Sequence, residues 1–142
     1  MHTITVNPDH GMVEVTVEGF WTSDHLRVFA GELLAALQAA TAGGRSSIVL
    51  CDYTRAAIQS QEVVAALQAF MANPPIRSRK VALFTKGMLA RQQARRLAAT
   101  RDEIRVFDDR AAALAWLEAG APSSTDRSVR WSANPARSSP AR

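Results

Sequence analysis

Residues 47–67, SIVLCDYTRAAIQSQEVVAAL, contain the pattern that decides the fold of this 142-residue chain. The first part, SIVLC, is apolar at nearly every position, which is typical of a strand that is covered on both faces. In the last part, Val63, Val64 and Leu67 recur at the spacing of an amphipathic helix. The stretch therefore predicts a strand followed by a helix, which is the unit from which parallel sheets are built.

Upstream of this unit, a hairpin and a helix are expected. Residues 2–6 and 12–18 alternate apolar and polar side chains, and the intervening NPDHG supplies turn residues. From about Ser23, apolar residues recur at helical spacing until Gly43 and Gly44 end the run.

Downstream, strands and helices continue to alternate. Pro74 and Pro75 end the helix that begins near Ser60. The further expected elements are a strand at 80–85, a helix at 88–100, a short strand at 103–107 and a helix within 108–120. The sequence thus predicts an α/β fold, with a mixed, mostly parallel sheet of four to five strands, flanking helices and an antiparallel N-terminal hairpin.

The composition predicts one folded domain and a tail. Apolar residues make up 47% of the chain and charged residues 21%, as in soluble globular proteins. Residues 121–142 are rich in Ser, Pro, Ala and Arg, so a disordered basic tail is expected there and a domain at residues 1–120. Of the net charge of +4, the tail carries +3 and the domain +1. The domain is close to neutral and lacks a motif with interleaved aromatic residues, so no nucleic-acid partner is expected.

The chain is expected to be cytoplasmic. Its single cysteine, Cys51, lies within an apolar run, so no intrachain disulfide can form and a reducing compartment is indicated. No segment approaches the roughly 20 apolar residues that span a bilayer, and the first residues do not read as a signal peptide.

Three stretches resemble the SpoIIAA-like, or STAS-like (STAS/SEC14-type), family of small bacterial proteins. They are CDYTRAAIQSQEVVAAL at 51–67, KVALFTKG at 80–87 and IRVFDDRAAALAWL at 104–117. The resemblance extends over residues 1–119 and implies a four- or five-stranded sheet flanked by helices. It also implies kinship with antagonists of anti-sigma factors and with domains on anion transporters. Most members of this branch have no assigned activity.

The resemblance also implies a place for a phosphoacceptor serine. In the phosphorylated antagonists, the acceptor is the first serine of an Asp-Ser-Ser-Gly-like motif, and Ser60 occupies that place. Gln59 stands where the motif has Asp, and Glu62 stands where it has Gly. Because the Glu62 carboxylate would repel a phosphate, we favour Ser60 as a helix N-cap worth ~1 kcal/mol, with the phosphorylation switch as the alternative.

Two further groups of residues are candidates for binding. Asp52 and Tyr53 follow a buried strand at the edge where open α/β sheets bind ligands, although an aspartate there more often bonds to loop amides. In the third helix, Arg91 and Arg95 lie on one face, while Leu89 and other apolar residues lie broadly on the opposite face. With the preceding Lys86, these arginines form a candidate anion-binding group, and a solvated basic face is the favoured alternative.

No constellation in the sequence indicates catalysis. The histidines at positions 2, 10 and 25 lack metal-ligand spacing, and Cys51 has no identifiable base. No glycine-rich phosphate loop is present. We therefore expect no enzyme, no cofactor and no metal.

The leading hypothesis is a non-enzymatic regulatory or protein-interaction domain. Its expected contact surface is the loop and helix start formed by Asp52, Tyr53, Gln59, Ser60, Gln61 and Glu62. The alternative is a module that binds a small anionic ligand or lipid in an apolar pocket near the strand ends, with Lys86 or Arg91 at the head group. The edge of the hairpin could also pair with a second copy to form a homodimer.

Overall fold

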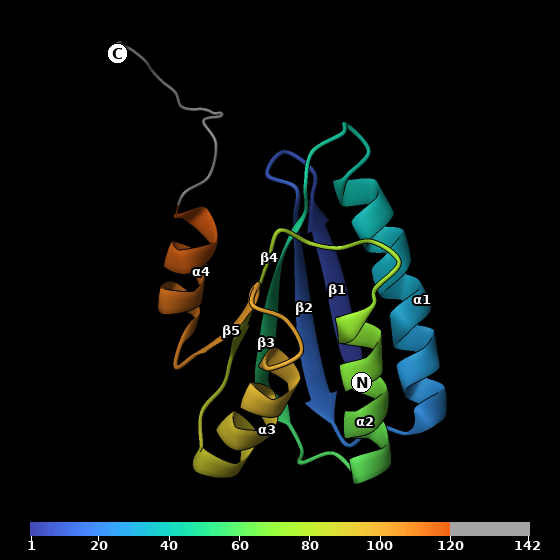
Figure 1. Ribbon diagram of the computed structural model, residues 1–142, viewed down its shortest axis with the longest axis vertical. Helices are drawn as coiled ribbons and strands as arrows, with labels where there is room; N and C mark the ends of the chain where they lie inside the picture. The colour runs from blue at the N-terminus through green and yellow to red at the C-terminus, as the bar shows by residue number, and fades with distance from the viewer. Residues whose placement is uncertain (120–142) are drawn as a thin grey trace.

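Residues 1–119, the part of the chain that the computed structural model describes, form five strands and four helices (Figure 1). In chain order the elements are β1 (His2–Asn7), β2 (Met12–Gly19), α1 (Ser23–Ala40), β3 (Ile48–Ala56), α2 (Gln61–Ala72), β4 (Lys80–Phe84), α3 (Met88–Ala98), β5 (Ile104–Phe107) and α4 (Arg110–Glu118). The predicted alternation of strands and helices is confirmed. The predicted tail at residues 121–142 lies outside the described residues.

The five strands form one mixed sheet in the order β1-β2-β3-β4-β5. β1 pairs antiparallel with β2, and each later pair of neighbours is parallel. In this register Cys51 of β3 lies between Val15 of β2 and Leu83 of β4. The predicted fold class, including the N-terminal hairpin, is confirmed. β1 is an edge strand, and its pairing with a second copy stays a prediction.

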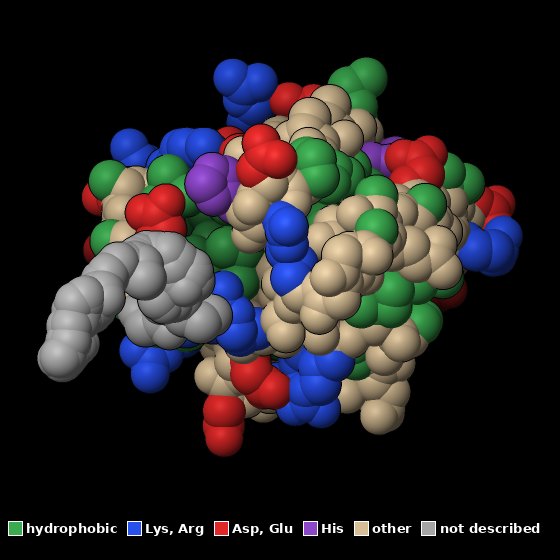
Figure 2. All heavy atoms as spheres, turned by 90° about the horizontal axis from the view of Figure 1, so that it is seen from above, with side chains coloured by type: hydrophobic (Ala, Val, Ile, Leu, Met, Phe, Trp, Pro, Cys, Tyr) green, Lys and Arg blue, Asp and Glu red, His purple; other side chains and the backbone are tan. Residues whose placement is uncertain are grey.

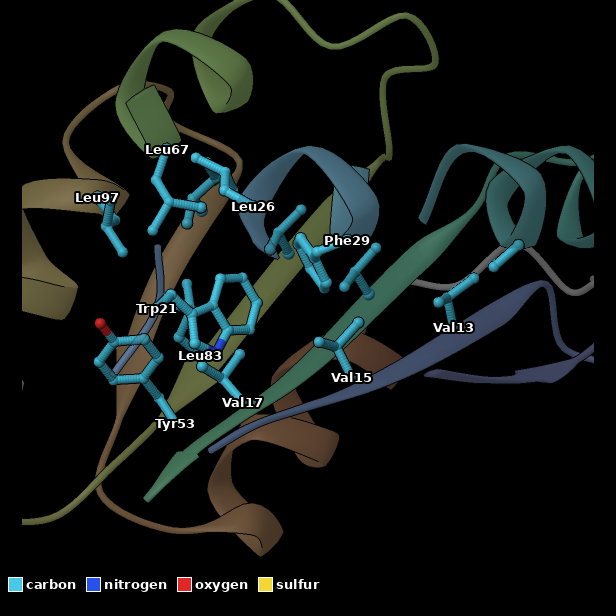
Figure 3. Close-up of a cluster of buried hydrophobic side chains, with 14 of the residues drawn as sticks. Val13, Val15, Val17, Trp21, Leu26, Phe29, Tyr53, Leu67, Leu83 and Leu97 are labelled. Carbon is cyan, nitrogen blue, oxygen red and sulfur yellow. The ribbon is translucent and has the colours of Figure 1, made fainter. Parts of the chain in front are cut away.

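Helices cover the two faces of the sheet unequally. Along β3, Val49 and Tyr53 pack in a core with side chains of α1, α2 and α3, while Ile48 and Leu50 pack on the other face against α4. This alternation follows from the two-residue repeat of a strand. The larger core is drawn in Figure 3, where side chains of the strands point toward those of the helices. The smaller core contains Ala113 of α4, which is fully buried.

Local chemistry sets where the helices begin. The side chains of Thr22, Ser60 and Asp109 cap α1, α2 and α4 by accepting hydrogen bonds from backbone N–H groups three residues later. α3 instead begins at Gly87, which has a φ of 90° and offers no side chain as a cap. That left-handed conformation favours glycine and turns the chain sharply from β4 into α3.

The two ends of the sheet expose different parts of the chain. The end with the β1–β2 turn, seen from above in Figure 2, shows basic, acidic and apolar side chains intermixed. The opposite end is the carboxyl edge of β2, β3 and β4, from which the chain enters α1, α2 and α3. In open α/β sheets this is the edge where ligands bind.

Candidate functional site

Three loops meet at the carboxyl edge of the sheet, and Gln59 joins two of them. Gln59 is 6% exposed, and its Oε1 accepts a hydrogen bond of 2.8 Å from the Trp21 backbone N–H. Its Nε2 donates to the carbonyls of Gly19 and Ala57, both at 2.9 Å. The whole amide is therefore used to hold the β2–α1 loop against the β3–α2 loop. Gln59 is not available to a partner, so its assignment to a contact surface is wrong.

A second buried amide, that of the Gln93 side chain, extends this hydrogen-bond network to α3. Its Oε1 accepts from the Tyr53 hydroxyl at 2.9 Å and from the Gln59 backbone N–H at 3.0 Å. Its Nε2 donates to the Gln59 carbonyl at 3.2 Å. Gln93 was not among the predicted site residues, although its position on the same helical face as Ala94 and Leu97 was a usable signal.

Tyr53 is a core residue as well. It is 2% exposed, and burial, followed by the nearby Cys51, raises the pKa of its hydroxyl to about 12. The expectation that Tyr53 belongs to an exposed site at the strand end is therefore wrong. Its hydroxyl stays protonated and serves as the donor to Gln93.

Ser60 and Asp52 have the local roles that were favoured for them. The Ser60 Oγ accepts a hydrogen bond of 3.2 Å from the Val63 backbone N–H, as an N-cap does. The Asp52 Oδ1 accepts from the Thr54 backbone N–H at 2.9 Å and from the Thr54 hydroxyl at 2.5 Å. Both side chains thus stabilise their own segments.

Two residues of the predicted contact loop are exposed. These are Gln61 and Glu62, in the first turn of α2. The Glu62 carboxylate accepts a hydrogen bond of 2.9 Å from the Ser23 hydroxyl at the start of α1. Their role as contact residues stays a prediction.

The predicted anion-binding group of Lys86, Arg91 and Arg95 is not one site. Arg91 forms an ion pair of 2.7 Å with Asp108, so an acidic side chain already neutralises its charge. Lys86 and Arg95 are exposed and form no ion pair within residues 1–119. They remain available to an anion, whereas Arg91 is already paired with a carboxylate through Nη2, and its buried Nε has no partner among the described residues.

Large apolar side chains are exposed in the first turn of α3. Met88 is 77% exposed and Leu89 is 67% exposed, although Leu89 was predicted to lie broadly on the apolar side of the helix, opposite the arginines. Ile58, which is 46% exposed, lies with Leu89 and Arg96 around a shallow hollow. We call these exposed residues the rim surface: Ile58, Lys86, Met88, Leu89, Arg95 and Arg96.

A cavity of about 100 Å³ lies inside the larger core, between the sheet and α1, α2 and α3. Its lining is almost entirely apolar and includes Trp21 and Phe29, which are drawn in Figure 3. Cys51 also lines it, and burial, followed by the charge of Asp52, raises the pKa of the thiol to about 12. The ligand hypothesis placed a pocket beside Lys86 or Arg91, and neither residue lines this cavity.

The cation at the cavity is Arg101, in the segment between α3 and β5, and the sequence analysis missed it. Its Nε and Nη1 are buried and have no hydrogen-bond partner among the described residues. Burial is the main cause that lowers the pKa of this guanidinium from its ordinary value, and the charge of Glu103 opposes that shift. Nothing in the local sequence marks Arg101, because its neighbours come from distant segments.

Two structural observations concern metals and membranes. Within residues 1–119, no three or more His, Cys, Asp or Glu side chains are grouped so that they could hold a metal ion. None of the four described helices combines the length and the apolar character needed to cross a membrane.

Comparisons with known proteins identify the fold. No family model matches the chain, and a search of curated proteins found no match. Among solved structures, the chain is similar to an uncharacterised protein of the DUF3478 family with a SpoIIAA-like fold from Shewanella loihica PV-4. The TM-score is 0.58 and the identity 20%, over 82% of this chain and 92% of that chain. The predicted resemblance is confirmed at the level of the fold: the chain has a SpoIIAA-like fold.

Proposed function

We propose that this domain is a non-enzymatic interaction module that binds an acidic protein partner through the rim surface. The observation that carries the proposal is the exposure of Ile58, Met88 and Leu89 at one end of the molecule. Contiguous exposed apolar side chains of this size are typical of interaction sites. Ile58 and Leu89 flank a shallow hollow, which gives a partner side chain a place to dock.

Charge supports an acidic partner. Lys86, Arg95 and Arg96 carry positive charges that no acidic side chain within residues 1–119 pairs with. Arg95 and Arg96 follow one another in the last turn of α3, and acidic groups on a partner would complement this unpaired positive charge. The combination of an apolar centre with a charged margin is the usual arrangement of a protein interface.

The absence of catalysis is part of the same proposal. Burial keeps the Cys51 thiol and the Tyr53 hydroxyl protonated, since the pKa of each is about 12. Neither group is therefore poised to act as a nucleophile or a general base near neutral pH. Ser60 uses its Oγ as a helix cap and has Glu62 in the following turn, so the proposed binding does not depend on phosphorylation.

A capture experiment with matched variants tests the proposed surface. The tagged protein is used to recover partners from a lysate of the source cells, in parallel with the double variant Met88→Ser/Leu89→Ser and the control Val28→Ser. Val28 lies on α1 and is 56% exposed, so the control removes a similar apolar side chain elsewhere. We expect a partner that the wild type and the control recover and that the double variant recovers at least about tenfold less. Equal recovery of every partner by the double variant would refute the rim surface.

A salt series and a charge reversal test the acidic character of that partner. Raising the ionic strength screens exposed charges, so recovery should fall between low and high salt. The triple reversal Lys86→Glu/Arg95→Glu/Arg96→Glu should reduce recovery at low salt and have little effect at high salt. Recovery that is independent of both changes would contradict an acidic partner.

A second candidate function is the binding of a small anionic ligand. The observation in its favour is Arg101, a half-buried residue at an apolar cavity, whose Nε and Nη1 are buried and have no hydrogen-bond partner within residues 1–119. A pocket with an apolar lining and one charged group is a common form of small-molecule site. A ligand there would not compete with a partner for the rim surface, since none of the rim residues lines the cavity.

A further inference from the structure

The cavity runs from the buried core to a half-exposed end. At its inner end lie Val15 and Trp21, which are buried. At its outer end lie Met71, from the last turn of α2, and Pro74 and Ile76, from the segment that follows, all of which are half-buried. Arg101 also lines the cavity and is half-buried, so we place the opening at these residues.

The guanidinium of Arg101 at this opening is not paired with a carboxylate. Two acidic residues follow it in the sequence: Asp102 is exposed and forms no ion pair within residues 1–119, and the Glu103 carboxylate is held by Arg77, whose Nη2 and Nε lie 2.7 and 2.9 Å from Oε2. Neither carboxylate forms an ion pair with the Arg101 guanidinium, whose Nε and Nη1 are buried and have no hydrogen-bond partner within residues 1–119.

The hydrogen-bonding chemistry of Arg101 indicates which head group a ligand in the cavity would carry. A buried charged donor without a partner is unfavourable, and an anion that accepts from it removes that penalty. Guanidinium groups bind carboxylates and phosphates well. The remainder of the lining is apolar, so the rest of the ligand must be apolar as well.

The volume selects the size of the apolar part. The cavity measures about 100 Å³. A protein cavity of about 150 Å³ holds benzene, so this one, two-thirds as large, has room for an apolar group of about four carbons. A long acyl chain does not fit inside the cavity without displacing core side chains. The phosphate and nucleoside of a nucleotide would remain outside it.

We infer that the cavity is a binding site for a small monocarboxylic acid with about four to six carbons, whose carboxylate meets Arg101 and whose apolar end lies against Trp21. This inference rests on the second candidate function and names its ligand class. It is independent of the rim surface, which lies on other residues.

Titration of the full-length protein with hexanoate tests the inference, with binding followed by calorimetry and by the amide resonances of cavity residues. Hexan-1-ol and hexylamine have the same chain with a neutral or a positive head group, and dodecanoate has the same head group on a longer chain. We expect hexanoate to bind at least about tenfold more tightly than hexan-1-ol, hexylamine or dodecanoate. This part of the test uses the wild type alone and so does not depend on the folding of a variant.

Two variants and a control locate the site. Arg101→Gln removes the cation, and Cys51→Met adds side-chain atoms inside the cavity; each should weaken hexanoate binding at least about tenfold. Arg27→Gln removes an exposed arginine of α1 that does not line the cavity and is not part of the rim surface, and it should change binding less than about twofold. Circular dichroism of each variant confirms that it is folded.

The outcomes separate the inference from the function on which it rests. Tighter binding of dodecanoate that still depends on Arg101 would overturn the proposed size class and leave the second candidate function standing. Equal binding of the acid, the alcohol and the amine would overturn the role of the cation. If none of these compounds binds, or if Arg101→Gln binds hexanoate as the wild type does, both the inference and the second candidate function are refuted.

Discussion

At the scale of single residues, Gln59 is the side chain on which the carboxyl edge of the sheet depends most. Its amide makes three hydrogen bonds, to the backbones of Gly19, Trp21 and Ala57, in a buried position. Truncation leaves buried backbone groups without partners, and each such group costs about 1–3 kcal/mol. We predict that Gln59→Ala lowers the free energy of unfolding by about 2–4 kcal/mol, measured by urea denaturation.

The neighbouring Gln61→Ala is the control for that measurement. Gln61 is exposed in the first turn of α2, so its truncation should change the free energy of unfolding by less than about 0.5 kcal/mol. Equal effects of the two substitutions would show that the buried network is not what holds the loops together.

Substitution of Arg101 is expected to raise the stability of the fold, whereas substitution of Gln59 lowers it. Its Nε and Nη1 are buried and have no partner in the described part of the chain, so replacement of Arg101 by a side chain of similar length without charge removes a penalty. We predict that Arg101→Met raises the free energy of unfolding of the ligand-free protein by about 1 kcal/mol, measured in urea. A loss of stability would mean that the guanidinium contributes to the apo fold and is not kept for a ligand.

The sequence predicted some of these residues and missed others for a physical reason. Ser60 and Asp52 act on backbone groups two or three residues away, so local capping and turn chemistry was sufficient to assign them. Gln59 and Gln93 bond to groups 34 to 40 residues away along the chain. No local pattern reports such pairs, because the strands and loops that bring them together must first be placed in space.

At the scale of elements, β1 and α1 are joined by a pair of histidines. The His2 Nδ1 lies 3.0 Å from the His25 Nε2, and the His2 Nε2 lies 2.7 Å from the Glu32 Oε1. A hydrogen bond between two imidazoles needs one nitrogen without a proton, so both rings cannot be charged while the bond persists. Burial, followed by the positive charges of the N-terminus and His2, lowers the pKa of His25 from 6.5.

This arrangement predicts a dependence of stability on pH. In the unfolded chain His25 binds a proton with its ordinary pKa, and in the folded protein it binds one less readily. Stability should therefore fall as the pH drops through about 6.5 toward the lowered pKa. Urea denaturation at pH 7.5 and 5.5 measures the decrease, which His25→Gln should reduce and His10→Gln, in the exposed turn, should not. A decrease of the same size in His25→Gln would assign it to other groups.

The helix α3 shows where periodicity is insufficient. The buried side chains are Gln93, Ala94 and Leu97, so the helix faces the core along a narrow arc in its second half. Leu89 falls near the border of that arc and in the first turn, at the edge of the sheet, where little core lies beneath it. The apolar pattern predicted the helix correctly, but the exposure of its first turn depends on where the sheet ends.

At the scale of the whole molecule, within residues 1–119, three helices cover one face of the sheet and α4 covers the other. The order of the elements followed from the alternating periods of residues 1–119, because strand and helix repeats are local properties of the sequence. The assignment of three helices to one face and α4 to the other did not follow, and neither did the cavity. Both depend on how the volumes of distant side chains add up across the sheet.

This division of the helices makes Leu117 a test of the second layer. Leu117 is fully buried in the core that α4 forms with Ile48, Leu50, Ala82 and Phe84. Within residues 1–119, α4 is the one helix in that core, so no neighbouring helix can move in to fill a space left there. We predict that Leu117→Ala lowers the free energy of unfolding by about 3–5 kcal/mol in urea, toward the upper end of such substitutions. The half-buried Leu114→Ala on the same helix should lose less than half as much, and similar losses would show that the second layer collapses around the space.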